Sequence, residues 1–210
     1  MSMRHRSALP LVLLLLALPL LGACSRLNCT RLEPLLGADV NLVRLGSTIT
    51  DTLVEKSFPP LMPRNPEQPI LTTTLVHINR LDKTSQFGRT LQSHVSSRFV
   101  ELGYGVKELQ LRKSLLLKEH QGEFMLSRDL SLIAEEHHAQ AVVVGTYSVA
   151  NRILYLSLRL VRPSDRSVLA TYDERLCLDE NTLQLLGLQY EELEELPAPR
   201  RSLLNRLLYW

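Results

Sequence analysis

The chain has 210 residues, of which 45% are hydrophobic, 22% charged and 5% aromatic. These fractions are ordinary for a globular protein and exclude a fibrous repeat or a wholly disordered chain. The formal net charge is +2, but residues 1–23 hold two arginines and no acidic residue, so the remainder is neutral, with 22 basic and 22 acidic side chains. A neutral chain lacks the electrostatic surface of a nucleic-acid binder. Three cysteines are too few for a disulfide scaffold.

The N-terminus contains the three parts of an export signal. Arg4 and Arg6 precede an apolar run over residues 9–21, and the small residues Gly22 and Ala23 follow it. This order predicts a secretory signal peptide over residues 1–23. The alternative is a transmembrane anchor. The run is shorter than the ~18–20 residues that span a bilayer, and two prolines interrupt it.

The end of this signal resembles the bacterial lipobox, with Leu21, Gly22 and Ala23 directly before Cys24. The resemblance implies that the signal peptidase recognises the first three residues and that the Cys24 thiol carries acyl chains such as palmitate. At ~0.8 kcal/mol per buried methylene group, more than one chain gives durable membrane anchoring. Ser25 stands where aspartate would favour retention in the inner membrane. We therefore expect a lipid-anchored protein on the periplasmic face of the outer membrane.

Two further cysteines, Cys29 and Cys177, would lie in the oxidising periplasm. They could form a disulfide, or each could be a small apolar residue without a covalent partner. The sequence leaves both alternatives open.

Residues 24–69 are expected to form a lipid-anchored tether. A candidate amphipathic helix lies within residues 41–58, where five apolar residues fall on one helical side. They are Leu42, Leu45, Ile49, Leu53 and Val54. Gly46 and three threonines weaken this helix prediction.

A proline-rich stretch ends the tether. Five prolines between residues 57 and 69 exclude a helix or an inner strand. We expect an extended linker that gives the protein reach, at ~3 Å per residue. A folded domain is then expected over residues 70–178.

Strand and helix signals alternate within that domain. Strands are expected at residues 70–78, 106–111, 141–150, 153–162 and 168–176, and helices at 86–102 and 127–138. The first helix is marked by five apolar residues spaced three or four apart, namely Phe87, Leu91, Val95, Phe99 and Leu102. In the second helix, Leu130, Ile133 and Ala134 are expected to face inward. Leucines alternate with other side chains in the strand expected at residues 153–162, which is the period of a half-buried antiparallel strand. The order β-α-β-α-β-β-β predicts an α+β sandwich with helices on one face of a mixed sheet.

Residues 179–210 differ in character from the domain. Four glutamates near the start of this segment are followed by a basic and apolar end over residues 200–210. One interpretation is a flexible tail with a short solvated helix. The other is a docking peptide for a partner protein or an interfacial helix.

Four blocks of residues carry a family resemblance, at positions 83–89, 122–129, 144–147 and 160–165. In this order behind a lipobox, they make the segment from about Ile70 to Asp179 resemble the FlgO family of flagellum-associated outer-membrane lipoproteins. The resemblance implies a non-enzymatic periplasmic domain connected with flagellar assembly and motility. It implies flagellar ring or other envelope proteins as partners. It supplies no catalytic residue, cofactor or small-molecule substrate.

Some charged residues are candidates for a partner-binding surface. Glu123, Arg128 and Asp129 lie within one of the blocks, and Arg89 lies within another. The first three could instead form a structural ion pair at a helix start. Arg89, Arg98 and Arg159 could form a basic patch, although the sequence does not place them on a common face.

The search for catalytic or metal-binding motifs is mostly negative. Glu135, Glu136, His137 and His138 are adjacent in sequence, so their side chains point about 100° apart on a helix and do not chelate one ion. His77 fits an ordinary hydrogen-bonded histidine, and no Walker motif or GxSxG elbow is present. We expect a non-enzymatic protein without metal or cofactor.

A second function fits the same architecture. It is a periplasmic lipoprotein that binds and activates a peptidoglycan synthase, which also needs no catalytic residues. An envelope hydrolase is disfavoured because no nucleophile–base pair is visible in the sequence.

Overall fold

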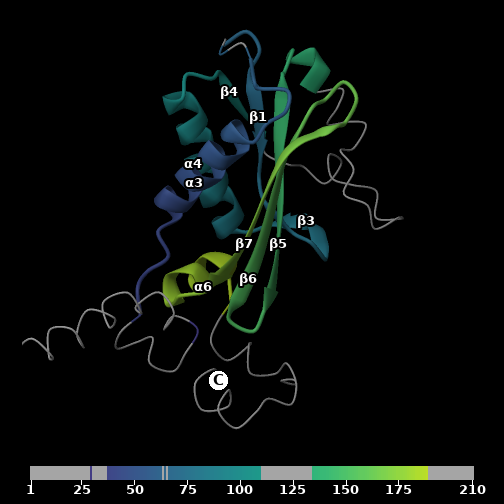
Figure 1. Ribbon diagram of the computed structural model, residues 1–210. Helices are drawn as coiled ribbons and strands as arrows, with labels where there is room; N and C mark the ends of the chain where they lie inside the picture. Colours follow the sequence, from purple (N-terminus) through teal and green to yellow (C-terminus); the bar gives the residue numbers. More distant parts are fainter. Residues whose placement is uncertain (1–28, 30–36, 63, 65, 110–133, 189–210) are drawn as a thin grey trace, which may run out of the picture.

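The computed structural model describes residues 29, 37–62, 64, 66–109 and 134–188, which form a mixed sheet with helices packed on it (Figure 1). Within these residues the sheet has seven strands. They are β1 (Ile70–Thr73), β2 (Val76–His77), β3 (Arg80–Thr84), β4 (Val106–Leu109), β5 (Ala141–Ala150), β6 (Ile153–Val161) and β7 (Val168–Cys177). The helices are α3 (Leu42–Glu55), α4 (Gln86–Glu101) and α6 (Glu180–Leu186). The predicted α+β architecture is confirmed.

Strand β5 divides the sheet into a parallel and an antiparallel part. Along one of its edges lie β1 and then β2, both parallel to it, with Ile70 opposite Ala141 and Val76 opposite Thr146. After β1 the chain forms β2, folds back on it as β3 and then continues through α4 to β4, which pairs parallel with β1. Along the other edge β6 and β7 follow as an antiparallel meander. The hairpin strand β3 was not expected from the sequence.

Helices α3, α4 and α6 cover one face of the sheet, with α3 and α4 side by side (Figure 1). Helix α4 buries the face predicted from its spacing, since Phe87, Leu91, Val95 and Phe99 are at most 1% exposed. Each such side chain contributes about 1.5–3 kcal/mol through burial. Leucines at alternate positions of β6 meet this layer from the sheet side, as the alternation in the sequence predicts.

Helix α3 belongs to this core, although we expected it in the tether. Leu45, Ile49 and Leu53 are buried against α4 and the sheet. A Cβ on Gly46 would stand 2.6 Å from His94 Cβ, so the glycine lets the two helices approach closely. The Thr50 hydroxyl also reaches across to donate to the carbonyl oxygen of Val95, at 3.2 Å. Gly46 and Thr50, two of the residues that weakened the helix prediction, are therefore the ones that dock it.

The proline-rich stretch is held against the domain and does not extend away from it. The Phe58 N–H donates to the carbonyl oxygen of Leu169 at 3.1 Å. The Tyr104 hydroxyl donates to the carbonyl oxygen of Leu61 at 3.2 Å, and the Leu61 side chain is buried. The packed unit thus begins before Ile70, because apolar burial by α3 and these hydrogen bonds fix the preceding segment.

The packed unit also continues beyond residue 178. Helix α6 begins with a cap in which the Asp179 carboxylate accepts the Thr182 N–H at 2.7 Å. Leu178 and Leu183 are almost completely buried in the main core. The boundary expected at residue 178 is therefore too early, because α6 supplies apolar surface to the core.

A smaller apolar cluster lies on the opposite face of the sheet. It joins Leu71, Val142 and Val161 to Ala134, which is helical together with the next two residues, at the start of the described stretch from 134 onward. Ala134 is fully buried, as the sequence predicted, but on the face opposite α3 and α4. Leu130 and Ile133, expected beside it, lie outside the described residues.

Among the described residues, no helix has the length and apolar character needed to cross a membrane. The apolar run at residues 9–21 lies outside the part of the chain that the structure describes.

Candidate interaction surfaces

Seven of the eight sequence-predicted site residues fall outside the described part of the chain. These are Leu21, Gly22, Ala23, Cys24, Glu123, Arg128 and Asp129. The eighth, Arg89, is exposed on the first turn of α4, where its Nη1 donates to Thr84 Oγ1 at 3.2 Å.

The three arginines considered for a basic patch do not share a face. Arg89 and Arg98 both belong to α4, which lies on the helix side of the sheet. Arg98 is engaged with the carboxylates of Asp51 and Glu101. Arg159 lies on β6 between buried leucines that face the helices, so its side chain points to the opposite face. The patch hypothesis is therefore wrong for this set.

Two of the resemblance blocks meet where α4 begins. Ser85 caps α4 by accepting the Gly88 N–H at 3.1 Å, and the Tyr147 hydroxyl donates to the same Ser85 oxygen at 2.8 Å. The Phe87 and Tyr147 rings pack edge to face with their centroids 5.6 Å apart. A Cβ on Gly88 would stand 2.2 Å from the carbonyl oxygen of Leu75, so the helix start needs glycine there. These residues form a structural junction between helix and sheet.

His77 belongs to the same junction. Its ring packs edge to face on Tyr147 with centroids 5.5 Å apart, and its Nδ1 accepts the Asn79 N–H at 3.1 Å. Burial lowers the pKa of His77, with the nearby Arg80 charge as a smaller cause. Burial also raises the pKa of the Tyr147 hydroxyl. Both groups are neutral at neutral pH, and the interpretation of His77 as a hydrogen-bonded histidine fits these contacts.

The buried polar side chains between α4 and β1 satisfy one another. The Gln92 amide donates to the carbonyl oxygen of Thr72 at 2.9 Å and accepts from the Thr74 hydroxyl at 2.7 Å. The hydroxyls of Thr72 and Ser96 are hydrogen-bonded at 2.7 Å. These contacts fix the register of the helix on the strand.

The face of the sheet away from the helices carries a groove of about 370 Å³. Two cross-strand rows of polar side chains from β5, β6 and β7 line it. One row is Thr146, Ser157 and Asp173, and the other is Ser148, Tyr155 and Arg175. Tyr155 is 47% exposed, and Ile78, 46% exposed, completes the lining.

The chemistry of this groove suits a protein segment. The two rows contain hydroxyls, one carboxylate and one guanidinium, which together can donate and accept hydrogen bonds. An exposed aromatic ring offers apolar contact. The sequence analysis did not identify the groove. The polar face of β6 was visible in the alternation of its sequence, but the register that aligns it with Asp173 and Arg175 was not.

The end of these strands that lies next to the groove holds a covalent link, because Cys29 and Cys177 form a disulfide with a sequence separation of 148. This settles the alternative that the sequence left open. Cys29 is buried and its sulfur lies 3.8 Å from the carbonyl oxygen of Arg152, in the turn between β5 and β6. The Leu178 N–H donates to that same oxygen at 2.8 Å. The residue five positions after Cys24 is thus fixed to the end of β7.

No group of three or more histidine, cysteine or acidic side chains that could hold a metal ion occurs within the residues that the structure describes.

Comparison with solved structures finds distant likenesses. The C-terminal domain of LpoB from Salmonella enterica is 10% identical, with 65% of this chain and 98% of that chain covered and a TM-score of 0.42. The C-terminal domain of LpoB from Escherichia coli is 11% identical, with 62% and 97% covered and a TM-score of 0.38. A putative neuraminyllactose-binding hemagglutinin homolog from Helicobacter pylori is 14% identical, with 65% and 86% covered and a TM-score of 0.31.

A comparison with curated protein sequences finds no significant match. A family model described as FlgO protein matches residues 47–181, which is more than half of the chain. The match begins within α3 and ends within α6, so it spans the packed unit and contains all four resemblance blocks. The chain therefore belongs to the FlgO protein family.

Proposed function

We propose that this protein is a non-enzymatic lipoprotein of the outer membrane that supports flagellar assembly, anchoring or motility through protein contacts in the periplasm. The observation that carries the proposal is the family match over residues 47–181. The lipobox at residues 21–24 supports the location, since it ends a segment with the three parts of a signal peptide.

The contacts of the reactive side chains support a binding role. The hydroxyls of Ser85 and Tyr147 and the imidazole of His77 take part in the helix–sheet junction, and Gln92 fixes α4 on β1. Each of these groups has a structural partner. The groove on the open face of the sheet supplies a surface with the mixed chemistry that protein segments recognise.

The alternative is a lipoprotein that binds and activates a peptidoglycan synthase. That role needs a tether long enough to carry the domain from the outer membrane to the enzyme. The disulfide favours the flagellar proposal, because it fixes the chain to the domain at Cys29, only five residues after the expected lipid site.

The proposal is tested by removing the protein from its own bacterium. We expect impaired swimming or poorly anchored flagella, restored by the wild-type chain and not by the Cys24→Ser variant. Normal swimming with normal flagella in the deletion strain would contradict the proposal. Cross-linking followed by native pull-down separates the two functions, since flagellar ring proteins are expected and a cell-wall synthase would support the alternative.

A further inference from the structure

The disulfide changes how far the domain can lie from its anchor. We define the anchor segment as residues 24–29, from the expected lipid site to the disulfide cysteine. Five residue steps span at most about 18 Å even when fully extended. A free tether of residues 24–69 would have reached about 140 Å at ~3 Å per residue.

A second attachment lies close to the first. The Asp179 carboxylate accepts the Val40 N–H, and the Asn181 side chain donates to Asp39 at 3.2 Å. The chain is therefore also fixed to the start of α6 immediately before α3 begins. Without the disulfide, the free segment would run from residue 24 to about residue 39 and reach about 50 Å. The disulfide thus shortens the maximum reach roughly threefold.

We propose that the end of the sheet bearing Cys177 and the turn at residues 150–153 is a membrane-facing surface, held against the lipid headgroups of the inner leaflet of the outer membrane. We call this surface the anchor end. The inference rests on the proposed lipidation of Cys24. It adds to the proposed function an orientation, and it names a lipid surface as the partner of this end.

The side chains at the anchor end fit the headgroup layer. Asn151, Arg152 and Glu180 are polar and at least partly exposed, and Ala150 is the apolar residue exposed in the turn. Such a surface rests among polar headgroups without insertion into the hydrocarbon layer. Anchoring then comes from the acyl chains, and the short segment supplies the proximity.

The length of the strands determines how far the rest of the domain lies from the bilayer. Strand β5 has ten residues and at ~3.3 Å per residue is about 33 Å long. The far end of the domain, with the turn between β6 and β7, therefore lies within about 50 Å of the bilayer. Tyr155 and Arg175 lie only two residues from the strand ends at the anchor end. A partner of the groove must therefore approach the outer membrane closely.

The test measures the distance of two labelled sites from a bilayer. Full-length lipidated protein is bound to phosphatidylethanolamine–phosphatidylglycerol vesicles that carry acceptor dye in the headgroups. A donor dye is placed by non-canonical amino acid at Ala150 or at Ser164, two exposed positions at opposite ends of β6. We expect strong energy transfer from position 150 and weak transfer from position 164.

Two insertions of ten Gly/Ser residues give a matched pair. One between Arg26 and Leu27 lengthens the anchor segment and adds up to about 35 Å of reach. The other, between Glu33 and Pro34, lies inside the loop that the disulfide closes and leaves the anchor segment unchanged. We expect the first insertion to abolish the difference between positions 150 and 164, and the second to preserve it.

Removal of the disulfide by mutation gives an independent readout. The Cys29→Ser, Cys177→Ser double variant frees the chain as far as residue 39, so transfer from position 150 should fall. Equal transfer from both positions in the unmodified protein, or equal effects of the two insertions, would overturn the proposed orientation alone. Failure to bind vesicles together with no fatty-acid labelling of Cys24 would overturn the orientation and the lipid anchor together.

Discussion

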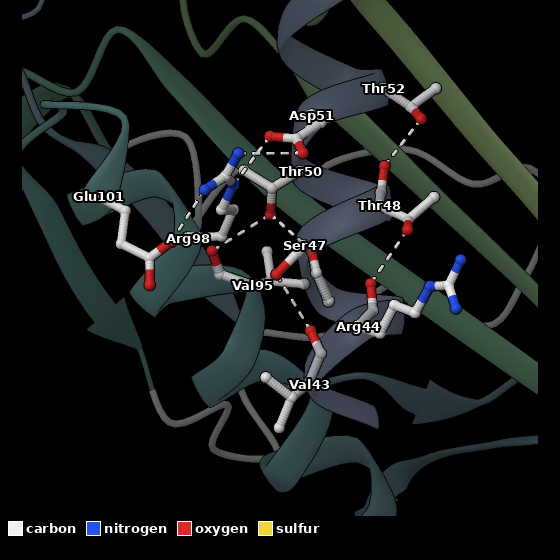
Figure 2. A network of polar contacts seen from close by, with 11 residues as sticks. Val43, Arg44, Ser47, Thr48, Thr50, Asp51, Thr52, Val95, Arg98 and Glu101 are labelled. Carbon is white, nitrogen blue, oxygen red and sulfur yellow. Dashed lines mark hydrogen bonds and ion pairs between the residues drawn. The ribbon is translucent and has the colours of Figure 1, made fainter. Parts of the chain in front are cut away.

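Arg98 on α4 donates two hydrogen bonds to the carboxylate of Asp51 on α3, at 2.8 and 3.1 Å, and so joins the two helices along their shared side (Figure 2). Its third hydrogen bond, at 2.9 Å, reaches Glu101 on its own helix. These side chains are partly exposed, so screening by solvent leaves the pair little stabilising energy. The main effect of the pair is to orient α3 on α4, because it fixes the two helices next to their close approach at Gly46.

The first prediction concerns that close approach. Gly46→Ala should lower the free energy of unfolding by about 1–3 kcal/mol, because the added methyl group would overlap His94. Thr48→Ala is the matched control, since Thr48 is exposed on the same helix and its hydroxyl bonds only within it. Denaturant unfolding measures both. A Gly46→Ala protein as stable as the control would show that α3 does not pack closely on α4.

The second prediction concerns the disulfide. Its loop is long, with a sequence separation of 148 residues. Closing a loop of this size restricts the unfolded chain and is worth about 3–5 kcal/mol. Replacement of both cysteines by serine should lower the unfolding free energy by that amount. Adding reductant should destabilise the wild-type protein and leave the double variant unchanged, and equal sensitivity of the two proteins would contradict the link.

The third prediction concerns acid. Burial lowers the pKa of His77 in the folded protein below the value of about 6.5 expected in the unfolded chain. The unfolded state then binds protons first as pH falls, so the stability contributed by neutral His77 is present above about pH 6.5 and is lost below it. Replacement by glutamine should flatten this decline. An NMR titration in which His77 shows an unshifted or raised pKa would refute the explanation.

The fourth prediction concerns alkali and the helix start. Burial raises the pKa of Tyr147 above its usual value of 10.0, so stability should fall as pH rises beyond about 10, where the unfolded chain ionises first. Tyr147→Phe should reduce this slope. At neutral pH it should cost about 1 kcal/mol, through loss of the hydrogen bond to Ser85. A double-mutant cycle with Ser85→Ala should show coupling, and strict additivity would argue against the contact.

Much of the fold follows from the sequence. The four-residue spacing in α4 and the alternation in β6 each predict an element, because one face of each must meet the core. Helix α3 was assigned to the tether because the proline-rich stretch after it was interpreted as an extended linker, and Gly46 and the threonines weakened the helix prediction itself. Propensity does not reveal that Gly46 permits close packing and that Thr50 forms a hydrogen bond to Val95. Tertiary contact outweighed local preference there.

The functional surfaces were harder to predict. The spacing of Cys29 and Cys177 along the chain carries no information on their distance in space, so the disulfide could not be deduced. The groove depends on a cross-strand register that aligns Tyr155 with Arg175. Arg89 is exposed on its helix, but its expected part in partner binding stays a prediction, as do the roles of Glu123, Arg128 and Asp129, which lie outside the described residues.

The fifth prediction concerns the groove. Tyr155→Ala and Arg175→Glu should impair swimming or partner recovery without loss of stability, because both side chains are exposed on the open face. Loss of an aromatic or arginine anchor typically weakens an interface by about 2 kcal/mol. Val43→Ala is the control, since Val43 is 58% exposed on α3, which lies on the face of the sheet opposite the groove. Full swimming with both groove variants would exclude the groove as the binding surface.

The central claim is a lipid-anchored protein that serves the flagellum. The measurement that tests it most directly is the swimming rate of a deletion strain complemented with the wild-type chain or with Cys24→Ser at equal expression. The account predicts that deletion impairs swimming, that the wild-type chain restores it and that Cys24→Ser does not. Undiminished swimming and normal flagella in the deletion strain would contradict the account.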